Sequence, residues 1–138
     1  MLTDLQAQQP DVAAHSFNLG YVFERMEQPL QAQAAFERAL VLNPRMDLAW
    51  YGLGEVLFRQ GLLGQAVKAW EQQVSLQPFC PHGLERLVVA HAAQAQWTQA
   101  RQRLDQLRCF EPRRAMALEP VVQSSAIASG ARLNPVPP

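Results

Sequence analysis

Apolar residues recur between positions 13 and 110 at the three- and four-residue spacing of amphipathic helices. Prolines and turn residues divide this region into segments of helical length. At about 1.5 Å of rise per residue, each segment would form a helix about 20 Å long. The pattern predicts helices at residues 13–26, 30–42, 48–60, 64–76, 82–95 and 97–110.

The same residue types return along the chain at a constant interval of about 34 residues. Prolines recur near the ends of alternate segments, and small and large apolar residues recur inside the segments. A fixed period of this kind is the signature of a repeat protein. The recurring residues are Leu19, Leu53 and Leu87; Gly20 and Gly54; Ala32, Ala66 and Ala100; Phe36, Trp70 and Leu104; and Pro44, Pro78 and Pro112.

Each recurring position has a physical role in a pair of antiparallel helices. Small residues such as Gly20 and Ala32 suit the place where two helices cross closely, and bulky residues such as Phe36 fill the space beside them. The recurring prolines disfavour continuation of the second helix and start the turn into the next repeat. Gly61 marks a hairpin turn, and Pro29 suits the opening turn of a helix.

In its period and its punctuation, the chain resembles the tetratricopeptide repeat family. Residues 13–46, 47–80 and 81–114 each hold one copy of the repeat. The resemblance implies an all-α fold, a right-handed superhelical solenoid of three helix-turn-helix repeats plus a C-terminal capping helix and an extended tail. The third copy departs most from the family pattern, because Val88 replaces the small glycine and His91 stands at an aromatic position.

A capping segment is expected after the last repeat, because a stack of repeats leaves its final apolar face uncovered. Residues 115–129 fit this role. Within them the sequence predicts a short helix at residues 120–129, with Pro120 in its first turn and Gly130 at its end.

The two ends of the chain are expected to differ from the repeats. Residues 1–12 fit either a partial helical cap or a disordered segment. Residues 130–138 form a proline-rich tail, which is expected to be extended and polyproline-like. This tail fits either a linear motif for a partner or a plain terminal segment.

Composition and charge exclude several classes of function. The formal net charge is +0, so no global field attracts nucleic acid or an anionic membrane surface. No apolar run approaches the roughly 20 residues of a membrane span, and the first residues lack the pattern of a secretory signal. We therefore expect a cytoplasmic protein. Cys80 and Cys109 form no CxxC motif, so no disulfide framework is expected.

The resemblance also implies where a partner would bind, because the first helix of each repeat builds the concave wall of such a solenoid. The candidate groove residues combine aromatic anchors with surrounding charges, as a peptide-binding surface requires. Tyr21 and Tyr51 favour the groove because each has a polar tip, whereas Phe17 and Phe58 fit the groove and packing between repeats equally well. The candidates are Phe17, Asn18, Tyr21, Glu24 and Arg25; Leu48, Tyr51, Glu55, Phe58 and Arg59; and His82, Glu85, Arg86 and Val89.

One branch of the family binds the C-terminal carboxylate of heat-shock chaperones through a set of Lys, Asn, Asn, Lys and Arg side chains. The matching positions here are Phe17, Tyr21, Gly52, His82 and Arg86. Only Arg86 agrees with that set, so a carboxylate clamp of this type is not expected.

No constellation in the sequence predicts a catalytic, cofactor-binding or metal site. Cys80, His82, His91 and Cys109 carry zinc-ligating groups, but their spacing fits no zinc motif. No serine stands in a nucleophile motif, and no glycine-rich phosphate loop occurs. We therefore expect a protein that is not an enzyme and that needs no cofactor.

One local basic cluster remains in the third repeat. Arg101, Asp105 and Arg108 share a helix face, so a solvated row of ion pairs explains part of it, while a docking patch for an acidic partner is the alternative. The cluster consists of Arg101, Arg103, Arg108, Arg113 and Arg114.

Taken together, the sequence predicts a non-catalytic protein–protein interaction scaffold that binds a partner polypeptide in the concave groove. The alternative is a structural subunit or assembly factor of a larger complex, which would use the convex face and the C-terminal tail. Both predict another protein as the partner, and nucleic acid is not expected. Homo-oligomerisation through the uncovered end of the array stays open.

Overall fold

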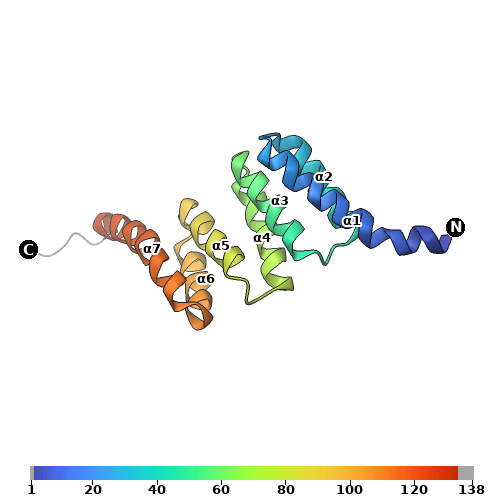
Figure 1. Ribbon diagram of the computed structural model, residues 1–138. Helices are drawn as coiled ribbons and strands as arrows, with labels where there is room; N and C mark the ends of the chain where they lie inside the picture. The colour runs from blue at the N-terminus through green and yellow to red at the C-terminus, as the bar shows by residue number, and fades with distance from the viewer. Residues whose placement is uncertain (1, 134–138) are drawn as a thin grey trace, which may run out of the picture. The chain divides into compact units, whose positions relative to one another are not determined.

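The computed structural model of the chain describes the backbone of residues 2–133 and the side chains of residues 12–123. Within this part all regular structure is helical and no strand occurs, so the predicted all-α fold is confirmed (Figure 1). The right-handed superhelical course stays a prediction. The helices are α1 (Leu2–Arg25), α2 (Pro29–Leu42), α3 (Asp47–Arg59), α4 (Leu63–Leu76), α5 (Pro81–Ala93), α6 (Trp97–Phe110) and α7 (Pro112–Leu133).

The predicted helix ends agree closely with the structure through the repeats. Helix α6 has the predicted bounds, and α2 to α5 each begin one residue before the predicted start. Pro29 and Pro81 explain two of these starts, because proline suits the first helical position, where its missing N–H costs no hydrogen bond. Helix α1 differs, since it begins at Leu2. Of the two alternatives for residues 1–12, the structure therefore shows a helix from Leu2 onward.

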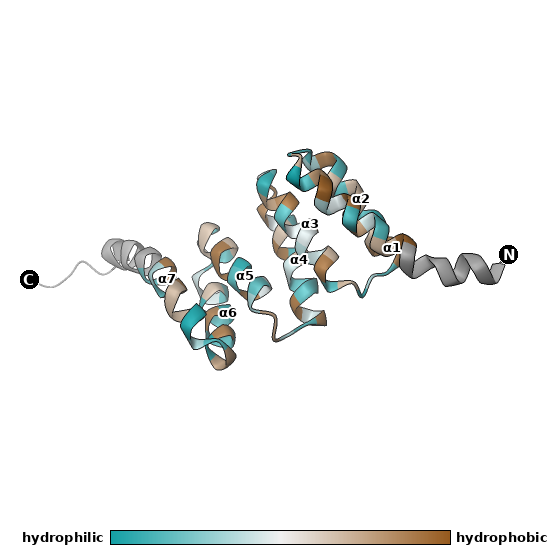
Figure 2. Ribbon diagram, viewed as in Figure 1, coloured by the Kyte–Doolittle hydropathy of each residue, from teal (hydrophilic) through white to brown (hydrophobic). Residues whose placement is uncertain are grey.

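The chain divides into two compact units, Met1–Pro78 and Phe79–Pro138, which we describe separately. In the first unit α1 packs on α2 and α3 packs on α4, while α2 also packs on α3. In the second unit α5 pairs with α6, and α7 lies against both. Figure 2 shows apolar positions interleaved with polar ones along the helices, as expected for helices with one buried side.

Both hairpins of the first unit are built around a glycine that faces an aromatic ring. A Cβ atom added at Gly20 would lie 2.7 Å from Cδ1 of Phe36, and one added at Gly54 would lie 2.6 Å from Cδ1 of Trp70. Phe36 and Trp70 are fully buried. The sequence predicted that these glycines allow two helices to cross closely. The structure shows that they leave room for the aromatic ring of the second helix.

The hairpin of the second unit uses different residues at the same positions. Val88 stands at the glycine position and Leu104 at the aromatic position, and both are buried. His91 is also buried, and its Nδ1 lies 2.7 Å from Oε1 of Gln96 in the hairpin turn. The degenerate third copy therefore still forms a packed helical hairpin.

The turns inside the three hairpins share one backbone conformation. Each contains a residue in the left-handed region: Glu27 with φ 58°, Gly61 with φ 81° and Ala95 with φ 57°. The next residue then closes the helix end, as the amide of Leu62 does by donating to the carbonyl of Leu57 at 2.9 Å. The predicted turn at Gly61 is confirmed, and the other two turns adopt its geometry without glycine.

Helix α7 is longer than the predicted capping helix. It begins at Pro112, passes through Pro120 without ending, and continues beyond Gly130 to Leu133. The predicted bounds of 120–129 are therefore wrong.

Packing explains why the proline does not end the helix. Ala115 and Val122 lie on either side of Pro120 in sequence, and both are buried in the second unit. A proline inside a helix costs about 3 kcal/mol, because it removes one hydrogen bond and crowds the preceding turn. Burial of apolar residues on the same helix offsets this cost.

The prediction of an extended tail from residue 130 is wrong as far as Leu133, where α7 ends. Residues 134–138 lie outside the described residues, so their predicted polyproline-like conformation stays a prediction.

Candidate functional site

The predicted groove residues of the first two repeats lie on α1 and α3, the first helices of the two hairpins in the first unit. These helices contact each other, so their outward-facing residues form one surface, which we call the α1–α3 surface. Asn18, Arg25 and Arg59 are exposed on these helices, and so is Leu48 at the start of α3. The same two helices carry the remaining candidates Phe17, Tyr21, Glu24, Tyr51, Glu55 and Phe58.

The two phenylalanine candidates pack inward. The ring centroid of Phe17 lies 5.8 Å from that of Phe36, and the ring centroid of Phe58 lies 5.8 Å from that of Trp70. Both side chains are half-buried, and their partners are the fully buried rings of the second helices. These contacts show packing inside a repeat, whereas the sequence left open the groove and packing between repeats.

Tyr21 is the large aromatic residue that this surface exposes to solvent. It is 52% exposed, and its ring centroid lies 6.0 Å from that of Phe17. Phe17 therefore supports the ring from one side while the rest of it stays accessible. Tyr51, on α3, is half-buried, and so is Glu55.

An ion pair joins the two helices beside Tyr21. Nη2 of Arg59 on α3 lies 3.7 Å from Oε1 of Glu24 on α1. Tyr21, Glu24, Arg25, Glu27 and Arg59 line one hollow at this place, which we call the Tyr21 hollow. The surface thus combines an accessible aromatic ring with two carboxylates and two guanidinium groups.

A second hollow adjoins the first and contains residues that the sequence did not identify. Glu24, Glu27 and Arg59 line it together with Pro29 and Val56. Glu27 and Pro29 belong to the hairpin turn and the start of α2, not to the first helix of a repeat. The left-handed backbone conformation of Glu27 brings its side chain to this hollow. The sequence did not predict this position, because glycine is the usual residue in that conformation.

The groove candidates of the third repeat belong to the second unit. His82 is exposed, whereas Glu85, Arg86 and Val89 are half-buried on α5. Glu85 accepts a hydrogen bond of 2.6 Å from Nη1 of Arg114 on α7. Its carboxylate is thus engaged within the unit.

The hydrogen bond from Arg114 to Glu85 changes the pKa of Arg114. The side-chain hydrogen bond to Glu85, followed by the Coulomb attraction of the same carboxylate, raises the pKa of Arg114 above its ordinary value. A raised pKa favours the charged form. The contribution to stability is therefore present below the ordinary pKa of arginine and is lost as the pH rises through the raised value.

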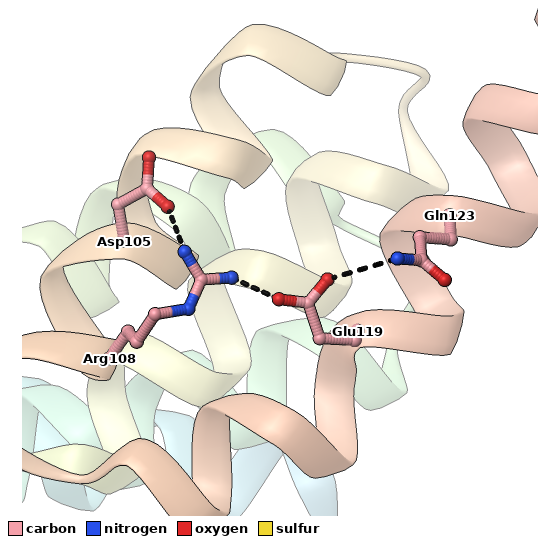
Figure 3. Close-up of polar contacts among 4 residues, drawn as sticks. All are labelled: Asp105, Arg108, Glu119 and Gln123. Carbon is pink, nitrogen blue, oxygen red and sulfur yellow. Dashed lines mark hydrogen bonds and ion pairs between the residues drawn. The ribbon is translucent and has the colours of Figure 1, made fainter.

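Arg108 and Arg114 of the basic cluster are engaged within the second unit, and Figure 3 shows the contacts of Arg108. Arg108 donates to Oδ1 of Asp105 at 2.7 Å, as the predicted row of ion pairs requires, and its other terminal nitrogen pairs with Glu119 on α7. Gln123 in turn donates to Glu119 at 3.5 Å. These contacts of Arg108 join α6 to α7, and the bond of Arg114 to Glu85 joins α7 to α5.

The residues considered for metal binding do not converge. Cys80 and Cys109 form no disulfide with each other; Cys80 is half-buried and Cys109 is exposed. Among the described residues, no group of three or more His, Cys, Asp or Glu side chains is arranged to hold a metal ion. None of the described helices combines the length and apolar character needed to cross a membrane.

Comparisons with known proteins agree with this architecture. The family profile described as the tetratricopeptide repeat matches residues 17–79. The first TPR of Spaghetti (RPAP3), solved with the HSP90 peptide SRMEEVD, superposes with a TM-score of 0.74 at 15% identity, over 84% of this chain and 97% of that one. The Arabidopsis OM64 TPR domain gives 0.77 at 13% identity, over 84% and 98%. YrrB, a TPR protein with an unusual peptide-binding site, gives 0.70 at 23% identity, over 78% and 56%.

A search of curated proteins found no match to the sequence. The assignment therefore depends on the matched repeat profile, on the similar solved structures, and on helical hairpins that recur in constant register. Residues 17–79 match the tetratricopeptide repeat family, and the fold of the chain is that of solved tetratricopeptide repeat domains.

Proposed function

We propose that the protein is a non-catalytic interaction scaffold and that the α1–α3 surface binds a segment of a partner polypeptide. The observation that carries this proposal is the exposed ring of Tyr21, supported by Phe17 and bordered by the Glu24–Arg59 pair. The solved tetratricopeptide structures that hold an HSP90 peptide or contain a peptide-binding site lend it support by analogy of fold.

An exposed tyrosine beside charged groups suits a peptide anchor. Its ring presents apolar area that can cover an aliphatic side chain, and its hydroxyl can bond to a peptide group. Burial of one such apolar side chain contributes about 1.5–3 kcal/mol. Arg25 and Glu27 flank the ring with opposite charges, so the hollow suits a segment that has an apolar residue next to polar or charged ones.

The chemistry of the surface argues for a partner other than a chaperone C-terminus. Phe17 and Tyr21 replace polar donors of the carboxylate clamp. Gly52, at a third clamp position, is buried, and a Cβ there would lie 2.6 Å from Cζ of Phe36. No side chain could therefore project from position 52 without displacing a core ring.

Replacement of Tyr21 by alanine tests the proposal. Peptides selected from a random library on the full chain would be measured by fluorescence anisotropy against the wild type and the variant. We expect Tyr21→Ala to weaken binding about 10- to 100-fold, since it removes the aromatic anchor. Leu30→Ala is the matched control, because Leu30 is an exposed apolar residue on α2 and should leave binding unchanged.

Circular dichroism should show the same helix content and nearly the same melting temperature for both variants, because both side chains are largely exposed. If selected peptides bind Tyr21→Ala as tightly as the wild type, the α1–α3 surface is not the binding site. The alternative role as a structural subunit depends on the convex face and on the tail, part of which lies outside the described residues, and it stays a prediction.

A further inference from the structure

The first unit contains two equivalent grooves between the helices of its hairpins. One is lined by α3 and α4, and the other by α1 and α2. The residues that line them correspond position by position at the repeat interval of about 34 residues. Corresponding pairs are Ser16 and Trp50, Leu19 and Leu53, Phe23 and Leu57, Ala35 and Ala69, and Arg38 and Gln72.

Helix α2 borders the groove of the second hairpin and covers the apolar face of α3 beside it. Gln33 and Glu37 of α2 border this groove, and Oε1 of Gln33 accepts a hydrogen bond of 2.8 Å from Nε2 of Gln60 at the end of α3. Under this cover the apolar residues of α3 are buried, with Leu53 only 7% exposed and Val56 only 1% exposed. One amphipathic helix is therefore sufficient to bury the apolar face of α3 beside this groove.

The described residues include no helix over the groove of the first hairpin. Leu19 and Val22, which correspond to Leu53 and Val56, are 38% and 50% exposed. Val12 and Met26 extend the same stripe of α1 and are exposed as well. Spacings of three, four and seven residues along a helix bring these side chains onto one face, as in a helix–helix seam.

We propose that this stripe, together with Ala35 and Arg38 of α2, is a docking site for an amphipathic helix of a partner protein. The second hairpin shows what such an occupant looks like, because α2 presents apolar side chains flanked by Gln33 and Glu37. We call the proposed site the α1 stripe. It lies on a different face of α1 from Tyr21, so it does not depend on the proposed function.

Two features specify the occupant further. Among the described residues that line this groove, Arg38 and His15 are the ionisable ones and none is a carboxylate, so the occupant should present a carboxylate to Arg38. Asn18 stands where the second hairpin has Gly52, whose small size admits the ring of Phe36. The occupant should therefore have a smaller apolar residue, such as leucine, at the position of Phe36.

The protein provides its own probe, since a peptide of residues 28–43 contains the helix that covers the equivalent face of α3. We would titrate two labelled peptides, the natural sequence and a Phe36→Leu version, with the full chain and follow fluorescence anisotropy. We expect the Phe36→Leu peptide to bind more tightly than the natural one. A Glu37→Gln change in that peptide should weaken binding about 3- to 10-fold, and added salt should reduce this difference.

A matched pair of variants of the full chain locates the binding. Val22→Asp places a charge in the α1 stripe and should weaken binding of the Phe36→Leu peptide at least about 10-fold. Val41→Asp makes the same substitution at an exposed position of α2 that belongs neither to the α1 stripe nor to the groove, and it should have no effect. Equal binding to both variants, or no binding of either peptide at about 1 mM, would overturn the proposal.

Sedimentation of the chain alone separates a partner helix from a second copy. A monomer that binds the Phe36→Leu peptide at the α1 stripe supports the proposal. A dimer that Val22→Asp dissociates and Val41→Asp does not would show that the stripe pairs with itself, and this would overturn the assignment of a partner helix.

Discussion

The two compact units solve the same packing problem with different residues. In the first unit, a glycine, which has no side chain, faces a large aromatic ring where the two helices of each hairpin cross, as Gly54 faces Trp70. In the second unit the crossing pairs two medium side chains, Val88 and Leu104, and both are as well buried as the ring. The summed side-chain volume of the two facing residues is similar for the pair Gly54 and Trp70 and for the pair Val88 and Leu104. A packed core tolerates exchange of residues more readily than a change of volume.

The two solutions differ in how they respond to change. A glycine against a ring leaves almost no adjustable space, since a single added carbon would overlap the indole. A valine against a leucine is a contact between two branched aliphatic side chains, of which the leucine can change rotamer. The first unit is therefore expected to be the less tolerant of substitution at its crossing, although its residues are the ones that match the family pattern.

The largest effect on stability is expected when Gly54 of the first unit is replaced by valine, the residue at the same position of the second unit, while Trp70 is left unchanged. Gly54→Val should destabilise the protein by about 3 kcal/mol, because its side chain must displace Trp70. Urea unfolding followed by circular dichroism measures the loss. The double variant Gly54→Val, Trp70→Leu recreates the pair of the second unit and should recover most of the stability. If the double variant is no more stable than the single one, conserved volume is not what relates the two crossings.

Gly64→Val is the matched control for this experiment. Gly64 also lies in a helix of the first unit, but nothing is within 4 Å of an added Cβ. Its replacement should change the unfolding free energy by less than about 0.5 kcal/mol.

The hairpin turns provide an effect of intermediate size. Gly61→Ala in the first unit should cost about 1 kcal/mol, because alanine is strained at φ 81°. Ala95→Gly in the second unit should have the opposite effect and raise the unfolding free energy by up to about 1 kcal/mol. Melting temperatures that move in opposite directions would confirm that the two turns are equivalent. A loss of stability in Ala95→Gly would show that Ala95 makes contacts that outweigh its strained backbone.

The smallest expected effect concerns charge in the second unit. Glu119→Gln removes the partner that α7 offers to Arg108 and should cost about 0.2–1 kcal/mol, since both side chains are partly exposed. The difference between variant and wild type should shrink in about 1 M salt, which screens the pair. Thermal melting in low and high salt tests this. A difference that is independent of salt would mean that Glu119 acts through packing.

The sequence predicted the features that recur with the repeat. Pro29 and Gly61 announced a helix start and a turn, and the period of about 34 residues located the hairpins. The candidates Tyr21 and Arg59 do lie on one surface, because they occupy corresponding faces of neighbouring first helices.

The features that the sequence did not predict depend on contacts between elements that are not copies of each other in the repeat. The bond between Glu85 and Arg114 joins a repeat to α7, which is not a copy of it. Glu27 enters the hollow only because a non-glycine residue adopts the left-handed conformation. The sequence also did not predict that α7 continues through Pro120. Proline disfavours a helix locally, but burial of Ala115 and Val122 on the same helix offsets that cost.

Pro120 also has a kinetic consequence. Having no amide hydrogen, it leaves the carbonyl of Met116 without its helical donor, so the hydrogen-bond ladder of α7 is interrupted at one rung. Transient opening of a native protein proceeds in cooperative blocks, and their borders lie where the backbone is least bonded. The turn that carries Arg114 and Ala115 is fastened to α5 and α6, so it should exchange its amide protons with solvent more slowly than the turn around Pro120. Helix α7 is one continuous helix, and we expect it to unfold locally in two parts.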